Sequence, residues 1–448
     1  MTDRVRLLVD DGLESYRESL FTLLEQPSIS TEGVGMDACA ETLLHLLERY
    51  GLDATRRIET ETHDLLYGEY LVGDGRPTVL FYGHYDVQPA DNDAEWRSDP
   101  FEPTLRDDSI FARGVGDNKG QLLAHVFALD VATTIDPGLA FNVKVLFEGG
   151  EESGSVGLQS YLDGEPPELE DVDFVFVSDG PMHSSGDPTI IYGNRGLLAM
   201  ELVCETARTD LHSGNYGGPM PNAAEDLARV VASLYEGDRS TEVAVEGFYD
   251  DIAVKDWAVD LIARVPYDPS AIEAETGVTP SDAAEYYTEL LLTPTLSVNG
   301  LMSGHAGDGI KTVIPATARA TLDARLVPDQ VPSRIYERIE RHVENHPVPA
   351  TLTKLGELPP MQSSPDGPYA NAIRRALIES WEVRPVEMPL MGGSLPSAYI
   401  QDALSVPVFI VPYANPDQGN HSPNEHLTME CFRSGILTSA NFLLDAGT

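Results

Sequence analysis

Phe141-Asn-Val-Lys-Val-Leu-Phe-Glu-Gly-Gly-Glu-Glu-Ser-Gly154 is the stretch in which an apolar strand runs into a glycine-rich turn. The apolar residues of its first half predict a buried strand, and the glycines place Glu151 and Glu152 in a tight turn at its carboxyl end. In open α/β sheets, ligands bind at this end of the strands. Adjacent side chains on such a turn point in different directions. One carboxylate could therefore bind a metal ion while its neighbour faces a substrate or water.

Further predicted strand ends carry side chains that can bind metal ions, so that four successive ends are marked in this way. The apolar run at residues 77–82 is followed by His84, and the apolar run at residues 172–177 is followed by Asp179. Asp117 lies in a glycine-rich turn directly before a predicted helix. Helix capping and solubility alone would scatter acids along the chain. The pattern therefore predicts that these side chains meet at one edge of an α/β sheet.

The order of the predicted elements indicates how a chain of 448 residues is divided into domains. From about residue 193 the elements follow the β-α-β-β-α-β order of a ferredoxin-like module, with its third strand expected over residues 313–326, and a doubly wound α/β pattern resumes after it. We expect residues 1–192 and 358–448 to form one α/β domain. A ferredoxin-like domain of residues 193–357 would then be inserted into it.

Composition excludes several classes of protein. No stretch reaches the roughly 20 apolar residues of a membrane span, and the first residues lack the apolar core of a signal peptide. Cys39, Cys204 and Cys431 form no Cys-x-x-Cys pair, which argues against a disulfide framework and against a thiolate zinc site. We expect a soluble, cytoplasmic protein without a membrane partner.

The formal net charge of −44 is the strongest compositional signal. It excludes nucleic acid as a partner, because phosphate binding requires a basic surface. Lysine is rare and acids are spread along the whole chain, a composition similar to that of cytoplasmic proteins from salt-accumulating halophiles. Molar salt shortens the Debye length to about 3 Å and so screens the mutual repulsion of these charges.

The candidate ligands have a characteristic chemistry and charge. They are His84, Asp117, Glu152, Asp179 and His421. Two imidazoles and three carboxylates without a thiolate suit zinc, manganese or cobalt in an open catalytic site. Two divalent cations are balanced by three carboxylates and one hydroxide, which is the nucleophile that a metal generates from water. The remaining acid, Glu151, is then free to act as a base.

These motifs resemble, in order, those of the M20 metallopeptidases, in particular the carnosinase-like dipeptidase branch. They run from about residue 25 to the C-terminus and comprise His84-x-Asp86, Gly116-Asp117-Asn-Lys-Gly, Glu151-Glu152-Ser-Gly-Ser, Ser178-Asp179, Asp210-Leu-His212-Ser-Gly and His421-Ser-Pro-Asn-Glu. The resemblance implies a phosphorylase/hydrolase-like catalytic domain with a mixed, mainly parallel sheet flanked by helices. It also implies that the ferredoxin-like insertion is a lid and dimerisation domain.

The resemblance assigns the ligands to two metal sites. It implies that Asp117 bridges two divalent ions, with zinc as the first choice and manganese or cobalt as alternatives. His84 and Asp179 would complete one site, and Glu152 and His421 would complete the other.

Other roles also follow from the resemblance. Glu151 would take a proton from the attacking water as general base and pass it to the leaving nitrogen as general acid. Asp86 would support the His84 site, and the Asp117-Asn118 peptide bond would be cis.

Substrate contacts are implied in the inserted domain and in a Gly-Gly-Ser turn. In the family, a histidine of the inserted domain reaches the neighbouring subunit's site; His212 matches it, with Thr312 beside it, so we expect a homodimer. Arg325 matches an arginine that clamps a substrate carboxylate, and Ser394 matches a substrate-contacting serine. The chain departs from the branch before this turn, where Leu390-Met391 stands in place of an expected acidic residue.

The residues therefore predict a dinuclear metal-dependent hydrolase that uses a metal-bridging hydroxide, with Glu151 as general base and acid. Its substrates would be dipeptides or short peptides with a free C-terminal carboxylate. The alternative is an N-acyl amino acid deacylase of the acetylornithine deacetylase or succinyl-diaminopimelate desuccinylase type, which would use the same ligands. A non-catalytic peptide-binding homologue is disfavoured because every ligand is present. The sequence leaves open the native metal, the side-chain preference and the placement of residues 236–293.

The charge generates a first prediction. The free energy of unfolding and the hydrolytic activity should both rise between low and molar KCl, because salt screens the repulsion among the acidic side chains. Urea unfolding and substrate turnover across a KCl series measure the two quantities. A protein that is fully folded and active in dilute buffer would contradict the halophilic interpretation.

Overall fold

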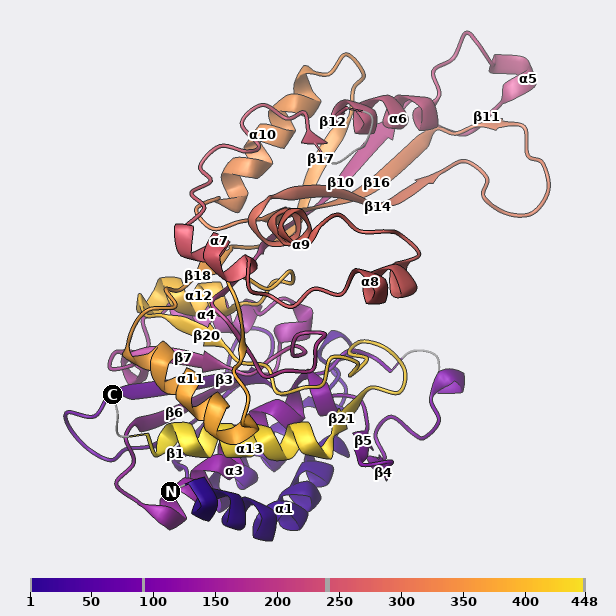
Figure 1. The fold of residues 1–448 in the computed structure, drawn as a ribbon. Coiled ribbons are helices and arrows are strands. Elements are labelled where there is room, and N and C mark those ends of the chain that lie inside the picture. The colour runs from indigo at the N-terminus through magenta and orange to yellow at the C-terminus, as the bar shows by residue number, and fades with distance from the viewer. Residues whose placement is uncertain (1, 91–92, 238–241, 446–448) are drawn as a thin grey trace.

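Two sheets of different size organise the chain in the computed structural model, which describes residues 2–90, 93–237 and 242–445. One is an eight-stranded mixed sheet, and the other is a four-stranded antiparallel sheet. In Figure 1 the larger sheet and its helices form the lower body, and the smaller sheet projects from it at the top. This architecture confirms the predicted α/β fold with a ferredoxin-like insertion.

The larger sheet has four parallel strand pairs, namely β6–β3, β3–β7, β7–β20 and β8–β19, and three antiparallel ones, β1–β2, β2–β6 and β20–β8. In spatial order its strands are β1 (Asp53–Ile58), β2 (Leu65–Tyr70), β6 (Asn142–Glu148), β3 (Thr78–His84), β7 (Phe174–Val177), β20 (Val408–Ile410), β8 (Thr189–Ile191) and β19 (Val386–Met388). The sheet is therefore mixed and mainly parallel, as predicted.

Helices cover both faces of this sheet, which explains why its central strands are buried along their whole length. Every residue of β3 and β6 is buried. One face packs against α1 (Thr2–Leu24), α2 (Met36–Arg49), α3 (Gly120–Ile135), α11 (Pro368–Trp381) and α13 (Met429–Leu443). The other face packs against α4 (Val156–Asp163) and α12 (Ser397–Leu404). No helix in the described ranges is long and apolar enough to cross a membrane.

The smaller sheet has the ferredoxin-like strand order and is covered on one face by two helices. Its elements are β10 (Gly196–Glu205), α6 (Ala223–Ser233), β14 (Thr295–Ser303), β16 (Thr317–Leu326), α10 (Pro332–Asn345) and β17 (Thr351–Leu358), and its strand order is β14-β16-β10-β17. Buried residues alternate along β10 and β16, as expected when one face meets a helix layer and the other does not.

One prediction within this domain differs from the structure. The strand expected over residues 313–326 is two strands, β15 (Val313–Ile314) and β16, which leave Pro315 between them. Proline has no N–H to donate to a ladder, so it separates the strands. The domain boundaries at 192/193 and 357/358 stay a prediction.

Residues 236–293, whose placement the sequence left open, contribute to a small apolar core beside the edge of the larger sheet. Ile262 and Leu291 are buried there together with Val386 of β19 and with Leu390. The described part of the segment contains β12 (Tyr235–Glu236), β13 (Glu242–Val243), α7 (Asp256–Ile262), α8 (Pro269–Thr276), α9 (Ala283–Tyr287) and η6 (Thr288–Leu292).

The remaining elements are short and connect the larger ones. They are η1 (Ser30–Glu32), η2 (Asp93–Glu95), η3 (Val115–Lys119), η4 (Glu151–Ser153), η5 (Pro167–Leu169), α5 (Ser213–Tyr216), the three-stranded sheet of β4 (Thr104–Arg106), β5 (Ser109–Phe111) and β21 (His426–Thr428), the pair β9 (Gly193–Asn194) and β18 (Met361–Gln362), and β11 (Leu211–His212), which pairs with β15.

Candidate metal centre and active site

Three adjacent parallel strands bring most of the predicted ligands to one edge of the larger sheet. His84 is the last residue of β3, Asp179 follows the end of β7, and Glu151 and Glu152 follow β6 in the single 3₁₀ turn η4. Because β6, β3 and β7 are parallel neighbours, their carboxyl ends lie side by side. The convergence expected at this edge is therefore present.

Asp117 lies at the same edge, although the strand before it is not part of the larger sheet, as the sequence had suggested it would be. It follows β5, which belongs to the separate three-stranded sheet, and lies in η3 before α3. β5 pairs with β21, and this pairing also brings the preceding loop with His421 towards Asp117. The peptide bond between Asp117 and Asn118 is cis, as the resemblance implied.

Asp117 lies between the two histidines, with one carboxylate oxygen facing each. Its Oδ1 is 3.0 Å from Nε2 of His84, and its Oδ2 is 3.1 Å from Nε2 of His421. His84 Nε2 is also 3.7 Å from Oδ2 of Asp179, and His421 Nε2 is 3.2 Å from Oε2 of Glu152. The five predicted ligands thus form two groups that share Asp117.

The charge of this cluster fits a divalent cation. Hydrogen bonds to Asp117 and Glu152 raise the pKa of His421 to about 10. Burial, together with the charge of Asp117, raises the pKa of Asp179 to about 7. Burial opposes the charged form of His84, but its hydrogen bond to Asp117 helps to raise its pKa well above the ordinary value. Burial and the neighbouring carboxylates thus favour the protonated forms of these groups, and a cation binding among them would displace the protons.

Further geometry supports the same conclusion. Ligand atoms of His84, Asp117 and Glu152 all lie within 4.8 Å of one another. The buried Oε1 of Glu152 has no hydrogen-bond partner among the described residues. Imidazole and carboxylate donors at this spacing are those that zinc, manganese and cobalt accept.

Asp86 organises the Glu151–Glu152 turn as well as His84. Its carboxylate accepts the backbone N–H groups of Glu151 and Glu152 at 3.2 and 3.0 Å. The same side chain lies 3.4 Å from Nδ1 of His84. It therefore touches two predicted ligands on different strands.

Several positioning residues were missed in the sequence although they lie inside the motifs. Gln88 donates to Oε2 of Glu152 at 2.9 Å, and Asn118 donates to Oδ1 of Asp179 at 3.1 Å. The buried carboxylate of Glu425 accepts the backbone N–H of Asp117 at 3.0 Å. Asn118 directly follows a predicted ligand, and Gln88 and Glu425 each lie four residues after one, which was the available signal.

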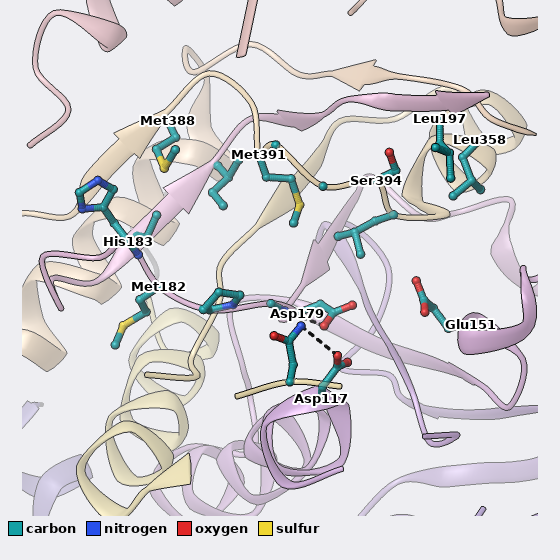
Figure 2. Close-up of a pocket in the computed structure, with 18 of the residues that line it drawn as sticks. Asp117, Glu151, Asp179, Met182, His183, Leu197, Leu358, Met388, Met391 and Ser394 are labelled. Atoms are coloured by element: carbon teal, nitrogen blue, oxygen red, sulfur yellow. Dashed lines mark hydrogen bonds between the residues drawn. The ribbon is translucent and has the colours of Figure 1, made fainter. Parts of the chain in front are cut away.

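A cavity of about 610 Å³ opens beside this cluster. Asp117, Glu151 and Asp179 line it together with Arg325 and Ser394. Nη1 of Arg325 donates to Oγ of Ser394 at 3.1 Å, and its Nε donates to Asp323 at 3.0 Å. In Figure 2, Ser394 lies across the cavity from Asp117 and Asp179.

His212 and Thr312 do not line this cavity. They are exposed, and Oγ1 of Thr312 lies 3.4 Å from Nε2 of His212. Figure 1 shows β11, which ends at His212, at the far tip of the smaller sheet. Within one chain, these two residues are therefore apart from the other predicted site residues.

Comparison with known proteins supports a common family. Residues 80–445 match Peptidase family M20/M25/M40. The chain is 30% identical over 384 residues to the Beta-Ala-His dipeptidase of Rattus norvegicus, an alignment that covers 83% of this chain and 77% of that protein. An M20 family metallo-carboxypeptidase from Sulfolobus solfataricus has a TM-score of 0.90 and 31% identity, covering 96% of this chain and 99% of that one. The dipeptidase Dug1p from Saccharomyces cerevisiae has a TM-score of 0.85 and 25% identity, covering 100% and 98%.

The position of Asp117 generates a prediction about metal binding. Asp117→Asn should weaken the binding of divalent metal by more than about tenfold, because it removes the charge that faces both histidines. Metal content after reconstitution and gel filtration measures the effect. The control is Asp260→Asn, which alters an exposed acid of α7 and should keep the wild-type content. Unchanged metal content in Asp117→Asn would contradict the shared-ligand geometry.

Proposed function

The chain belongs to Peptidase family M20/M25/M40 and is a metallopeptidase of that family, and on this premise we propose that it cleaves the amide bond of dipeptides or short peptides with a free C-terminal carboxylate. The observation that supports this most directly is the shared cavity. It is lined by carboxylates of the ligand cluster, by Glu151 and by one guanidinium, that of Arg325. Hydrolysis of an amide needs metal ligands and a proton carrier, and a terminal carboxylate needs a cationic partner.

The ligand groups support two metal ions per chain, with zinc proposed first and manganese or cobalt as alternatives. His84 and Asp179 would hold one ion, Glu152 and His421 would hold the other, and Asp117 would be shared. When bound, divalent ions supply Lewis acidity, which polarises the scissile carbonyl and lowers the pKa of a water molecule.

Glu151 is proposed to carry the proton between water and the leaving nitrogen. Its backbone is held by Asp86, while its side chain lines the cavity. Burial raises its pKa well above the ordinary value, with the negative charges of Asp179 and Glu152 acting in the same direction. A raised pKa suits a carboxylate that must accept a proton in one step and release it in the next.

Arg325 and Ser394 are proposed to bind the substrate carboxylate. The planar guanidinium can form two parallel hydrogen bonds with a carboxylate, and Asp323 holds its Nε in place. Oγ of Ser394 accepts a hydrogen bond from Arg325, so the serine lies where it would contact the same substrate carboxylate. An N-acyl amino acid also ends in a carboxylate, so a deacylase remains the second candidate and would use the same contact.

The proposed role of Glu151 generates a prediction. Glu151→Gln should lower kcat by about 10² to 10⁴, because glutamine cannot accept the proton, while metal content stays unchanged. Turnover of a dipeptide and metal analysis measure the two quantities. Glu152→Gln is the matched control and should lose metal. A Glu151→Gln variant with nearly normal turnover would overturn the assignment within the pair.

His212 and Thr312 are proposed to act in the site of a neighbouring subunit. Their distance from the cavity in one chain is consistent with this idea, since a second chain would have to bring them to it. His212 would donate to the oxyanion that develops on the substrate carbonyl. A homodimer is thus part of the proposed active enzyme.

Subunit mixing tests this arrangement. His212→Ala and Glu151→Gln should each be nearly inactive alone, whereas random reassociation should restore about a quarter of wild-type activity, because half the dimers would be mixed and each would hold one intact site. Mixing Glu151→Gln with Glu152→Gln is the control and should restore nothing, since both residues belong to one subunit's site. No recovery in the first mixture would contradict a role for His212 across the interface.

A further inference from the structure

The wall of the cavity beyond the ligand cluster is apolar and rich in methionine. Met182, Met388 and Met391 line it, together with Ile191 and Leu395. Figure 2 shows the three methionines on the side of the cavity that carries His183. Methionine side chains are flexible and polarisable, so such a wall can adapt to apolar groups of different shapes.

The side chain of Met391 approaches the residue that follows Asp179. Its terminal methyl carbon is 3.7 Å from the position that a Cβ atom would occupy on Gly180, the residue after Asp179. Its backbone is held on both sides, because its N–H donates to Gly193 at 2.9 Å and its carbonyl accepts from Arg195 at 3.3 Å. The backbone of Met391 is therefore fixed and its side chain reaches the residue after Asp179, at the place where the family resemblance led us to expect an acid.

The polar group on the same side of the cavity is also uncharged near neutral pH. Nδ1 of His183 lies 3.1 Å from Oγ of Ser185, and its Nε2 lies 3.1 Å from the hydroxyl of Tyr287. Burial lowers the pKa of this imidazole below its ordinary value. Both ring nitrogens of His183 are therefore engaged within the protein, and the imidazole adds no charge to the wall.

Within one chain, the described residues that line the cavity offer no free carboxylate to a substrate ammonium group. Among the described residues that line it, the acids are Asp117, Glu151 and Asp179. In the proposed function, Asp117 and Asp179 hold metal and Glu151 carries the proton. An α-ammonium group on the acyl side of the scissile bond would lose its hydration next to thioethers and bound cations, which is unfavourable without a free carboxylate.

We propose that this enzyme prefers substrates whose acyl side is neutral and apolar, that is, N-acylated peptides in which the α-nitrogen of the residue on the acyl side of the scissile bond carries an acyl group, over dipeptides with a free α-amine. This inference rests on the proposed function and specifies its substrate class. In the reaction, water adds its oxygen to the acyl carbon, the C–N bond breaks, and the leaving nitrogen takes a proton. The products are an N-blocked acid and a free amino acid.

A matched pair of peptides tests the inference at one and the same bond. N-acetyl-methionyl-leucine and methionyl-leucine differ only in the charge on the methionine nitrogen. We expect kcat/KM for release of leucine to be at least about tenfold higher for the acetylated peptide. Equal or higher kcat/KM for the free dipeptide would overturn the proposal.

Variants at Met391 test whether this residue of the methionine wall determines the preference for the acetylated peptide. Met391→Glu places a carboxylate beside the ligands and should shift the ratio of the two kcat/KM values at least about tenfold towards the free dipeptide. Met391→Gln has nearly the same shape without the charge and should leave that ratio close to the wild-type value. Metal content is measured in both variants. An unchanged ratio in Met391→Glu with normal metal content would contradict the role of this residue.

A binding measurement separates this inference from the proposed function. Calorimetric titration of the Glu151→Gln protein compares its affinity for the two peptides without turnover, and the acetylated peptide should bind more tightly. If neither peptide is hydrolysed with zinc, manganese or cobalt, the proposed function is wrong, while the titration still tests the preference. Equal affinities, or tighter binding of the free dipeptide, would count against the neutral acyl side.

Discussion

The arrangement of the site depends on the buried carboxylate of Glu425. It accepts four hydrogen bonds, from the guanidinium of Arg113 and from the backbone N–H groups of Gly114, Gly116 and Asp117, at 2.8 to 3.0 Å. Charge-assisted bonds of this kind are stronger than neutral ones. They hold the loop that presents Asp117 to both histidines. Asn118 and Gln121 add further hydrogen bonds from the same segment, to Asp179 and to the carbonyl of Gly116.

The other ligands depend on the sheet. His84, Glu152 and Asp179 follow three adjacent parallel strands whose residues are buried between two helix layers, so their positions are set by the most rigid part of the molecule. Asp86 joins two of these strand ends by accepting the N–H groups of the Glu151–Glu152 turn. The site thus combines a rigid sheet edge with one loop that the buried Glu425 holds through four hydrogen bonds.

Like charges are crowded into this site in a chain whose net charge is −44. In the absence of metal, hydrogen bonds to Asp117 and Glu152 raise the pKa of His421. Burial and the charge of Asp117 raise the pKa of Asp179. Divalent ions relieve the crowding more effectively than protons, so metal binding and the integrity of the site are coupled. The opposite wall, with its methionines, does not add to the repulsion among these carboxylates. The acids are thus gathered where metal ions would bind, and the opposite wall offers no negative charge to a substrate ammonium group.

The sequence by itself determined the elements and the ligand candidates. Continuous apolar runs indicated buried parallel strands, and the residues at their ends were named correctly as neighbours because parallel strands share an edge. It also indicated the inserted β-α-β-β-α-β domain, although Pro315 divides one of its predicted strands. These features are local, since periodicity and turn chemistry report on a few consecutive residues at a time.

Only the tertiary structure decided which distant segments meet. Glu425 lies 308 residues from Asp117, and β21 pairs with β5 to bring His421 to the same carboxylate. The segment that includes Leu291 packs beside the sheet edge that carries the methionine wall, and nothing in its own sequence indicated that place. Hydrogen bonds and packing between such segments depend on the path of the whole chain. Residue spacing could therefore name the candidate ligands, but the loop that presents Asp117 to both histidines and the methionine wall required the folded molecule.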